Sequence, residues 1–357
     1  MLDKATSIRK GEAFNKASLE AYLKTVIPNF NAITEVQQFP GGFSNLTYLL
    51  KTNLGEWVLR RPPFGAKIKS AHDMAREFRV LSKLRGIYGR IPEAIHLCEE
   101  SSILGSPFYL MERVKGLILR NRPPKNMDLN PSRMRAISEA AIDNLALLHQ
   151  IDIKTTGLED LGKAEGYIGR QVSGWIKRYN NAQTDDIAAM DNLAKWMIEN
   201  EPGDGCVGLI HNDYKYDNLI LDIDEPARIL AVLDWEMATT GDTRMDLGTT
   251  LAYWAEAEDA QMINMGIGNL SWLPGNLNRQ EVAERYAKTT DHDIDNILFY
   301  FVYGTFKIGV IAQQIYARWK NGITKDPRFG QLIHAVHYLS QLGSTAIDYD
   351  RISHLSK

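Results

Sequence analysis

Residues 211–218 read HNDYKYDN, and this stretch decides how the rest of the chain is interpreted. It leads directly into residues 219–236, LILDIDEPARILAVLDWE. Two short apolar runs in that second stretch are separated by the turn formers Asp224-Glu225-Pro226, which predicts a β-hairpin. A hairpin would bring Asn218 and Asp234 together, although they are far apart in the sequence.

The side chains of these stretches suit the transfer of a phosphoryl group. A carboxylate from Asp234 and an amide oxygen from Asn218 are the hard oxygen ligands that Mg²⁺ prefers. Asp213, on the adjoining loop, is placed to accept a proton from an attacking hydroxyl. Each residue alone has a structural alternative, an Asx turn or a cap. The three residues at this spacing favour the chemical interpretation.

The first third of the chain predicts a small antiparallel sheet with one helix. Apolar alternation and turn residues predict strands at 32–39, 46–52, 56–60, 94–99 and 108–113. Apolar residues at helical spacing predict an amphipathic helix over 72–84.

Beyond Gly116 helical patterns dominate, beginning with a long helix predicted over 134–151. We therefore expect an α+β, bilobal fold. A β-rich lobe would span residues 1–113, with a hinge at about 111–116, and a mostly helical lobe would span 117–357.

Composition narrows the class of protein. The formal charge of −3 gives no basic face, which argues against a nucleic-acid partner. The two cysteines, Cys98 and Cys206, fit no metal or disulfide framework. The apolar run 297–312 is shorter than a membrane span and contains Lys307, so we expect a buried helix and no membrane association. With no secretory signal at residues 1–16, a cytoplasmic location is expected.

Three motifs occur in a specific order: HNDYKYDN at 211–218, VLDWE at 232–236 and GDTRMDLG at 241–248. In this respect the chain resembles the aminoglycoside phosphotransferase and choline kinase superfamily, relatives of the protein kinases. The resemblance implies a bilobal, protein-kinase-like fold in which the lobe at 1–113 binds the nucleotide and the lobe at 117–357 carries the catalytic loop and the acceptor site. The stretches FPGGFSNLTYLL, REFRVL and RYAKTTDHD are similar to the kinase-like domain found fused to acyl-CoA dehydrogenase.

The resemblance implies a role for each motif residue. Asp213 matches the catalytic base, and His211 matches the usually structural histidine of the catalytic loop. Asn218 and Asp234 match the two ligands of Mg²⁺. For Asp246, the expectation comes from the sequence itself: it opens the helical segment DLGTTL, so we expect helix capping first, and anchoring of the catalytic loop second.

The resemblance also implies a nucleotide site for ATP or GTP. Arg60 matches the strand residue that meets the α- and β-phosphates, with Glu77 as its helix partner. The loop over the phosphates is expected to contain Gly41, Gly42, Ser44 and Asn45, and the hinge backbone that meets adenine is expected at Glu112 and Val114.

Three features of the sequence put parts of the family pattern in question. Asn212 occupies a position where relatives usually carry glycine, which puts the local backbone geometry in question. Arg60 is followed by Arg61, which could compete for the phosphate-binding role. The loop around Gly41 also lacks the G-x-G-x-x-G spacing.

The expected function is transfer of the γ-phosphate to a hydroxyl of a small-molecule acceptor. Trp235 and Glu236 are candidate acceptor contacts. A catalytically silent nucleotide-binding module, a metal-dependent hydrolase and an aminoglycoside-type antibiotic kinase remain alternatives. The resemblance to the dehydrogenase-fused domain suggests a hydroxyacyl acceptor, and it leaves a homodimer open.

Overall fold

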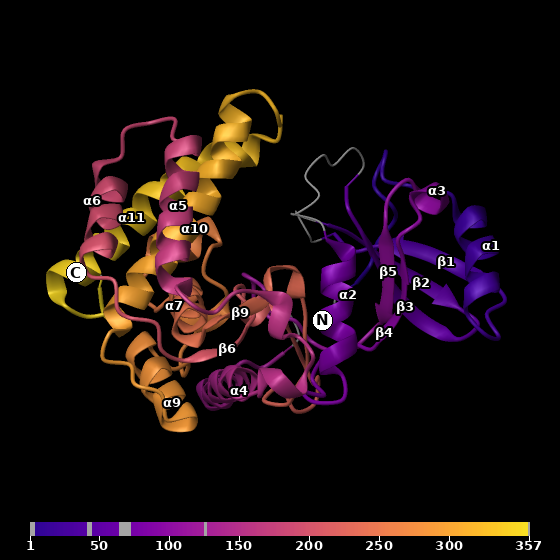
Figure 1. The fold of residues 1–357 in the computed structure, drawn as a ribbon, viewed down its shortest axis with the longest axis horizontal. Helices are drawn as coiled ribbons and strands as arrows, with labels where there is room; N and C mark the ends of the chain where they lie inside the picture. Colours follow the sequence, from indigo (N-terminus) through magenta and orange to yellow (C-terminus); the bar gives the residue numbers. More distant parts are fainter. Residues whose placement is uncertain (1–3, 41–44, 64–72, 125–126, 356–357) are drawn as a thin grey trace. The chain divides into compact units, whose positions relative to one another are not determined.

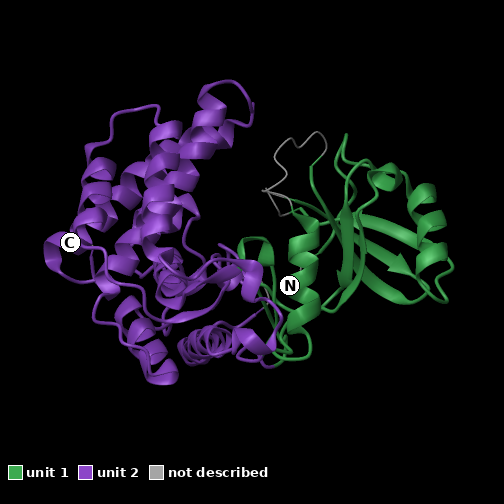
Figure 2. Ribbon diagram, viewed as in Figure 1, with its two compact units in different colours: residues 1–118, 219–224, 229–238 green, residues 119–218, 225–228, 239–357 purple. Residues whose placement is uncertain are grey.

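The computed structural model describes residues 4–40, 45–63, 73–124 and 127–355 of the chain (Figure 1). It divides into two compact units (Figure 2). Unit 1 contains residues 1–118, 219–224 and 229–238, and unit 2 contains residues 119–218, 225–228 and 239–357. The segments 219–224 and 229–238 are therefore part of unit 1, although they follow the expected hinge in the sequence.

Unit 1 is built on a five-stranded sheet of order β1-β2-β3-β5-β4, in which every pair is antiparallel. The strands match the five predicted runs to within two residues at either end. Their bounds are Ile33–Gln38 (β1), Leu46–Thr52 (β2), Gly55–Arg61 (β3), Ala94–Cys98 (β4) and Phe108–Glu112 (β5).

Helices lie on both faces of this sheet, as Figure 1 shows. The predicted helix is α2 (Met74–Leu84), which contacts β4 and β5. The prediction missed α1 (Lys16–Val26) and the single turn α3 (Ser101–Leu104). These two cover the opposite face, where α1 buries Leu19 and Leu23 in the core of unit 1. Only one turn-spaced pair in α1 is fully buried, so its periodic signal in the sequence is weak.

Arg60 and Arg61 are consecutive residues of β3, so their side chains lie on opposite faces of the sheet. Successive side chains of a strand point to opposite faces. Arg61 lies on the face covered by α1 and α3 and donates to the carbonyl oxygen of Leu104 at 2.9 Å. Arg60 therefore points to the face covered by α2.

The hairpin predicted from the sequence is present in unit 1. Strand β7 (Leu219–Leu221) pairs antiparallel with β8 (Ile229–Val232). Leu221 also bridges to Leu117. A Cβ on Gly116 would collide with the Ile220 side chain and the Leu221 carbonyl, so only glycine permits this close approach.

Unit 2 is mainly helical. Its central helix is α10 (Ile297–Lys320), which contacts α5, α6, α7 and α11. The other helices are α4 (Pro131–His149), α5 (Tyr167–Ala182), α6 (Ala188–Glu199), α7 (Thr243–Tyr253), α8 (Ala260–Met265), α9 (Arg279–Thr290) and α11 (Leu332–Tyr349).

The apolar run 297–312 lies within α10 and is largely buried inside unit 2, as predicted. Within the described part of the chain, no helix has the length and apolar character needed to cross a membrane.

A two-stranded antiparallel ladder in unit 2 supports the HNDYKYDN stretch. Strand β6 (Val207–Ile210) pairs with β9 (Thr239–Asp242), and the stretch begins at the residue after β6. The stretch ends in the short 3-10 helix η4 (Tyr216–Asn218). We call residues 211–218 the catalytic loop from here on, after the role that is expected of them.

Candidate active site

The carboxylate of Asp213, on the catalytic loop, is fixed by two neighbouring side chains and remains partly exposed to solvent. Oδ1 lies 2.6 Å from Nζ of Lys215, and Oδ2 accepts a hydrogen bond from the Asn218 amide at 2.9 Å. About a fifth of the Asp213 side chain, 19%, remains exposed. A carboxylate that is fixed on two sides and still reachable suits a general base.

Lys215 is a site residue that sequence reasoning missed. Its ammonium lies 4.3 Å from the centre of the Tyr253 ring, as well as against Asp213. Burial disfavours the charge, but Tyr253 and Asp213 outweigh it and raise the pKa of Lys215. A cation therefore stays beside the candidate base at neutral pH. Its position two residues after Asp213 was the available signal.

Asp246 anchors the catalytic loop, so the expected role as a helix cap is wrong. Asp242 caps α7 by accepting from the Arg244 amide at 2.9 Å. The fully buried Asp246 carboxylate instead accepts from the backbone amides of His211 (2.6 Å) and Asn212 (2.8 Å). Asp246 therefore ties the start of the HNDYKYDN stretch to α7.

The charge of Asp246 is maintained by its neighbours. Burial alone would raise its pKa, but the side chain of His149 at 3.1 Å and the loop amides lower it below the ordinary value of 3.8. The carboxylate is thus ionised at neutral pH, and its bonds to the loop are charge-assisted.

His211 is buried, and its Nδ1 accepts the backbone N–H of Asp213 at 3.3 Å. The ring is therefore inaccessible to an acceptor substrate, and its bond supports the backbone at Asp213. Asn212, between them, has a left-handed backbone with φ of 67°. That conformation explains why glycine suits this position, and asparagine is among the few other residues that tolerate it.

In unit 1, the guanidinium of Arg60 forms ion pairs with three carboxylates. Its guanidinium lies 3.1 Å from Glu77 on α2, 2.9 Å from Asp234 and 3.6 Å from Glu236. Glu77 is 1% exposed, and this burial raises its pKa while the charge of Arg60 opposes the rise. The structure thus brings together the strand arginine, its expected helix partner and the expected metal-binding aspartate. Arg61 does not compete, because it points to the other face of the sheet.

Asp234 lies two residues after the end of β8 and has a left-handed backbone with φ of 67°. A third of its side chain, 33%, is exposed. Asn218, in unit 2, precedes the other strand of the same hairpin, where Leu219 pairs with Val232. The Asn218 amide nitrogen donates to the Asp213 carbonyl (2.8 Å) and carboxylate, which directs the amide oxygen elsewhere.

The expected nucleotide loop is described only in part. Gly41, Gly42 and Ser44 lie outside the described residues. Asn45 is buried, and its amide donates to Glu236 at 2.7 Å. This bond places the end of the loop beside the Arg60 cluster.

Two further expectations concern the hinge and the acceptor. Glu112 ends β5, where its backbone N–H donates to Glu93 at 2.8 Å, and Val114 follows two residues later with a half-buried side chain. Trp235 is fully buried and donates to the Val232 carbonyl at 2.9 Å, so it presents no surface to an acceptor.

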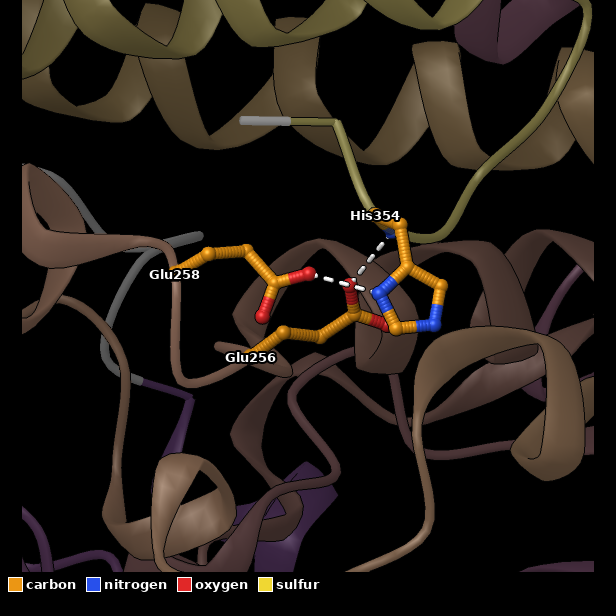
Figure 3. A group of neighbouring side chains, drawn as sticks. All are labelled: Glu256, Glu258 and His354. Carbon is orange, nitrogen blue, oxygen red and sulfur yellow. Dashed lines mark hydrogen bonds and ion pairs between the residues drawn. The ribbon is translucent and has the colours of Figure 1, made fainter. Parts of the chain in front are cut away.

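A second polar cluster lies elsewhere in unit 2. Glu256, Glu258 and His354 offer one ligand atom each within 4.8 Å of one another (Figure 3). Glu256 already accepts the backbone amides of Arg279 and His354, each at 2.8 Å, and His354 bonds to Glu258 at 2.7 Å. We assign the cluster to the attachment of the residues around 354.

A catalytic-loop carboxylate on a helical unit and an Arg–Glu pair on a five-stranded antiparallel unit define a kinase-like phosphotransferase. The chain belongs to the phosphotransferase enzyme family, because the model of that family matches residues 35–279. The resemblance inferred from the three motifs is therefore confirmed.

Curated relatives and solved structures agree with this assignment. Human acyl-CoA dehydrogenase family member 11 is 35% identical over 318 residues, which cover 87% of this chain and 40% of the relative. Mouse acyl-CoA dehydrogenase family member 10 is 35% identical over 326 residues, which cover 88% of this chain and 29% of the relative. The chain thus spans less than half the length of these relatives.

A structure from Ralstonia eutropha, provisionally called an aminoglycoside phosphotransferase, superposes with a TM-score of 0.78 at 30% identity. The alignment covers 93% of this chain and 97% of that one. The complex of APH(2")-IIIa with GDP and kanamycin has a TM-score of 0.63 at 16% identity, covering 91% and 99%, and shows the shared fold.

Proposed function

We propose that this chain is a small-molecule kinase that transfers the γ-phosphate of ATP or GTP to a hydroxyl group. The observation that carries the proposal is the state of Asp213. Its carboxylate is fixed by Lys215 and Asn218, stands on a loop anchored by buried Asp246, and is still partly exposed.

The transfer step forms one bond to the γ-phosphorus and breaks another. The acceptor oxygen forms a bond to the γ-phosphorus while the bond from that phosphorus to the bridging oxygen of the nucleoside diphosphate breaks. The hydroxyl proton passes to the Asp213 carboxylate and then to solvent. Holding the hydroxyl in line with the phosphorus supplies most of the acceleration that the protein can give, since the transition state is loose.

The residues present fit a divalent cation. Asp234 supplies a partly exposed carboxylate and Asn218 an amide oxygen, and both are hard ligands suited to Mg²⁺. When bound, Mg²⁺ would neutralise charge on the phosphate oxygens. Arg60 orients Asp234, because its guanidinium donates a hydrogen bond to one carboxylate oxygen at 2.9 Å.

The remaining roles concern the nucleotide. We propose that Arg60 meets the α- and β-phosphates, and that Glu77 holds its guanidinium in place. The loop of Gly41, Gly42, Ser44 and Asn45 would cover the phosphates, and the backbone at Glu112 and Val114 would meet the adenine. Glu236 remains a candidate acceptor contact.

The acceptor is the least constrained part of the proposal. Relatives named as acyl-CoA dehydrogenase family members point to a hydroxyacyl compound, whereas the kanamycin complex points to an amino sugar. The test is release of nucleoside diphosphate against a panel that contains both classes, with the product followed by phosphorus NMR.

Each outcome of that test separates the candidates. Acceptor-dependent turnover with a phosphate monoester as product supports the kinase. Release of inorganic phosphate at a rate that does not depend on the acceptor would indicate a hydrolase. A thermal shift with Mg²⁺–ATP, together with no turnover on any hydroxyl compound, would indicate a silent binding module.

A further inference from the structure

The ammonium of Lys307 is buried in the middle of α10, with 1% of the residue exposed. Nζ donates to the backbone carbonyl of Asn212 at 2.9 Å, to Oδ1 of Asn212 at 3.3 Å and to Oγ1 of Thr249 at 3.3 Å. An ammonium has three N–H donors, so each one has an acceptor. Two of the three acceptors belong to the catalytic loop.

None of these acceptors is charged. Among the described residues, no ion pair joins Lys307 to a carboxylate, and the centre of the Trp175 ring lies 5.9 Å from Nζ. Lysine is almost never fully buried unless it is paired with a charge. A lysine that serves only packing would be replaced by an apolar residue at lower cost. The arrangement therefore points to a role in the loop.

The fold places Lys307 there through a close crossing of α7 and α10. A Cβ on Gly304 would collide with the Gly248 carbonyl, and a Cβ on Gly248 would collide with the Tyr300 carbonyl. The two helix backbones can approach only because both positions are glycine. Lys307 lies one turn beyond Gly304, and Thr249 follows Gly248, so the crossing brings their side chains together.

The Asn212 carbonyl and the Asp213 N–H belong to one peptide group. Lys307 holds the oxygen of that group at 2.9 Å, and Nδ1 of His211 accepts its N–H at 3.3 Å. The second Lys307 bond reaches the side chain of Asn212, the residue with the left-handed backbone. The peptide plane is thus held at both ends, immediately before the candidate base.

We propose that Lys307 is a positioning residue for phosphoryl transfer, which fixes the Asn212–Asp213 peptide group and thereby aims the Asp213 carboxylate. The proposal rests on the proposed function for its catalytic readout. Asn212 contributes the side-chain oxygen that a glycine at this position would lack.

The charge of Lys307 gives a readout that distinguishes positioning from packing. Burial lowers the pKa of Lys307 to about 8, although Asp246 on α7 and Asp213 on the loop favour the charge. Lys215 on the loop and Arg178 on α5 disfavour it. As the pH rises through about 8, the ammonium loses a proton and with it one N–H donor, so the hydrogen bonds from Lys307 to the loop weaken.

The contribution of Lys307 to the free energy of unfolding changes with pH in the opposite direction to its effect on turnover. A folded pKa below the unfolded value of 10.5 means that the unfolded chain binds more protons between about pH 8 and 10.5. The contribution of Lys307 to folding therefore rises with pH across this window, while its effect on turnover falls. A purely structural role would not make activity and stability diverge.

The experiment compares wild-type protein with Lys307→Met and Val310→Ala. Val310 is a fully buried residue of the same helix, one turn further on, and controls for loss of packing. We expect Lys307→Met to lower kcat roughly 10- to 100-fold with KM for the nucleotide nearly unchanged. The decrease in wild-type kcat near pH 8 should be absent from the methionine variant.

Amide hydrogen exchange supplies a readout independent of turnover. The segment 208–216 should exchange at least about tenfold faster in Lys307→Met than in wild type or Val310→Ala. Equal exchange in all three proteins would overturn the proposal even if no acceptor were known. Turnover in wild type with an unchanged kcat in Lys307→Met would overturn it while leaving the kinase assignment intact.

Discussion

Replacing Asp246 with asparagine perturbs the loop anchor while keeping nearly the same shape. In the wild-type protein Oδ2 accepts from His211 N–H and His149, and Oδ1 accepts from Asn212 N–H. Asparagine has one oxygen and one NH₂ group in these places. In the better orientation its NH₂ faces the Asn212 N–H, so one buried donor is left without an acceptor.

The expected cost follows from these contacts. An unpaired buried N–H costs about 1–3 kcal/mol, and the two remaining bonds lose their charge assistance, worth roughly 1 kcal/mol together. We therefore expect the free energy of unfolding of Asp246→Asn to fall by about 3 kcal/mol, roughly a hundredfold in the unfolding equilibrium. Turnover should fall as well, because the backbone amides of His211 and Asn212 lose their fixed acceptor.

Urea denaturation followed by tryptophan fluorescence measures the stability change. Asp191→Asn is the matched control, since Asp191 is exposed on α6 and the same substitution there should change stability by less than about 0.5 kcal/mol. The pKa of Asp246 is lowered by folding, so its contribution is present above about pH 4 and is lost as the pH falls through the folded value. The deficit of Asp246→Asn should thus narrow in acid. A deficit below 1 kcal/mol at pH 7, or one that is independent of pH, would refute the reasoning.

Three further predictions concern unit 1. Arg60→Met should cost about 3–5 kcal/mol in urea denaturation by leaving the Glu77 charge buried, and Arg60→Met/Glu77→Leu should recover most of it. Because burial raises the pKa of Glu77, the single variant should regain stability as the pH falls; a double variant no better than the single one would contradict the pairing. Asp234→Asn should weaken binding of Mg²⁺–ATP about 10- to 100-fold in calorimetry without changing the melting temperature by more than a few degrees, and unchanged affinity would remove Asp234 from the metal site. Gly116→Ala should cost about 1–3 kcal/mol, whereas Gly86→Ala, where a Cβ has open space, should be near neutral.

Much of unit 1 could be predicted from the sequence, since its strands carry period-two alternation and end at turn residues. The pairing of Arg60 with Glu77 was implied by the family resemblance, with Arg61 left as a competitor. The structure excludes Arg61, because alternation along β3 sends the two arginines to opposite faces. Helix α1 was missed because its apolar face is narrow. It depends on the sheet beneath it rather than on its own periodicity.

The loop anchors were harder to predict. Asp246 is an aspartate near the start of a helix, which in sequence has the signature of a cap, and only the neighbouring Asp242 shows that the cap position was taken. Lys307 reads as an interruption in an apolar run. Its partners, Asn212 and Thr249, are 95 and 58 positions away in the chain, so no local pattern connects them.

The most direct test of the account is a comparison of wild-type protein with Asp213→Ala. Single-turnover transfer from γ-labelled ATP to an accepted hydroxyl compound would be measured beside the affinity for Mg²⁺–ATP. The account predicts that transfer falls at least about 100-fold while nucleotide affinity stays nearly the same. Full transfer by Asp213→Ala would show that another group takes the proton, and the proposed mechanism would be wrong.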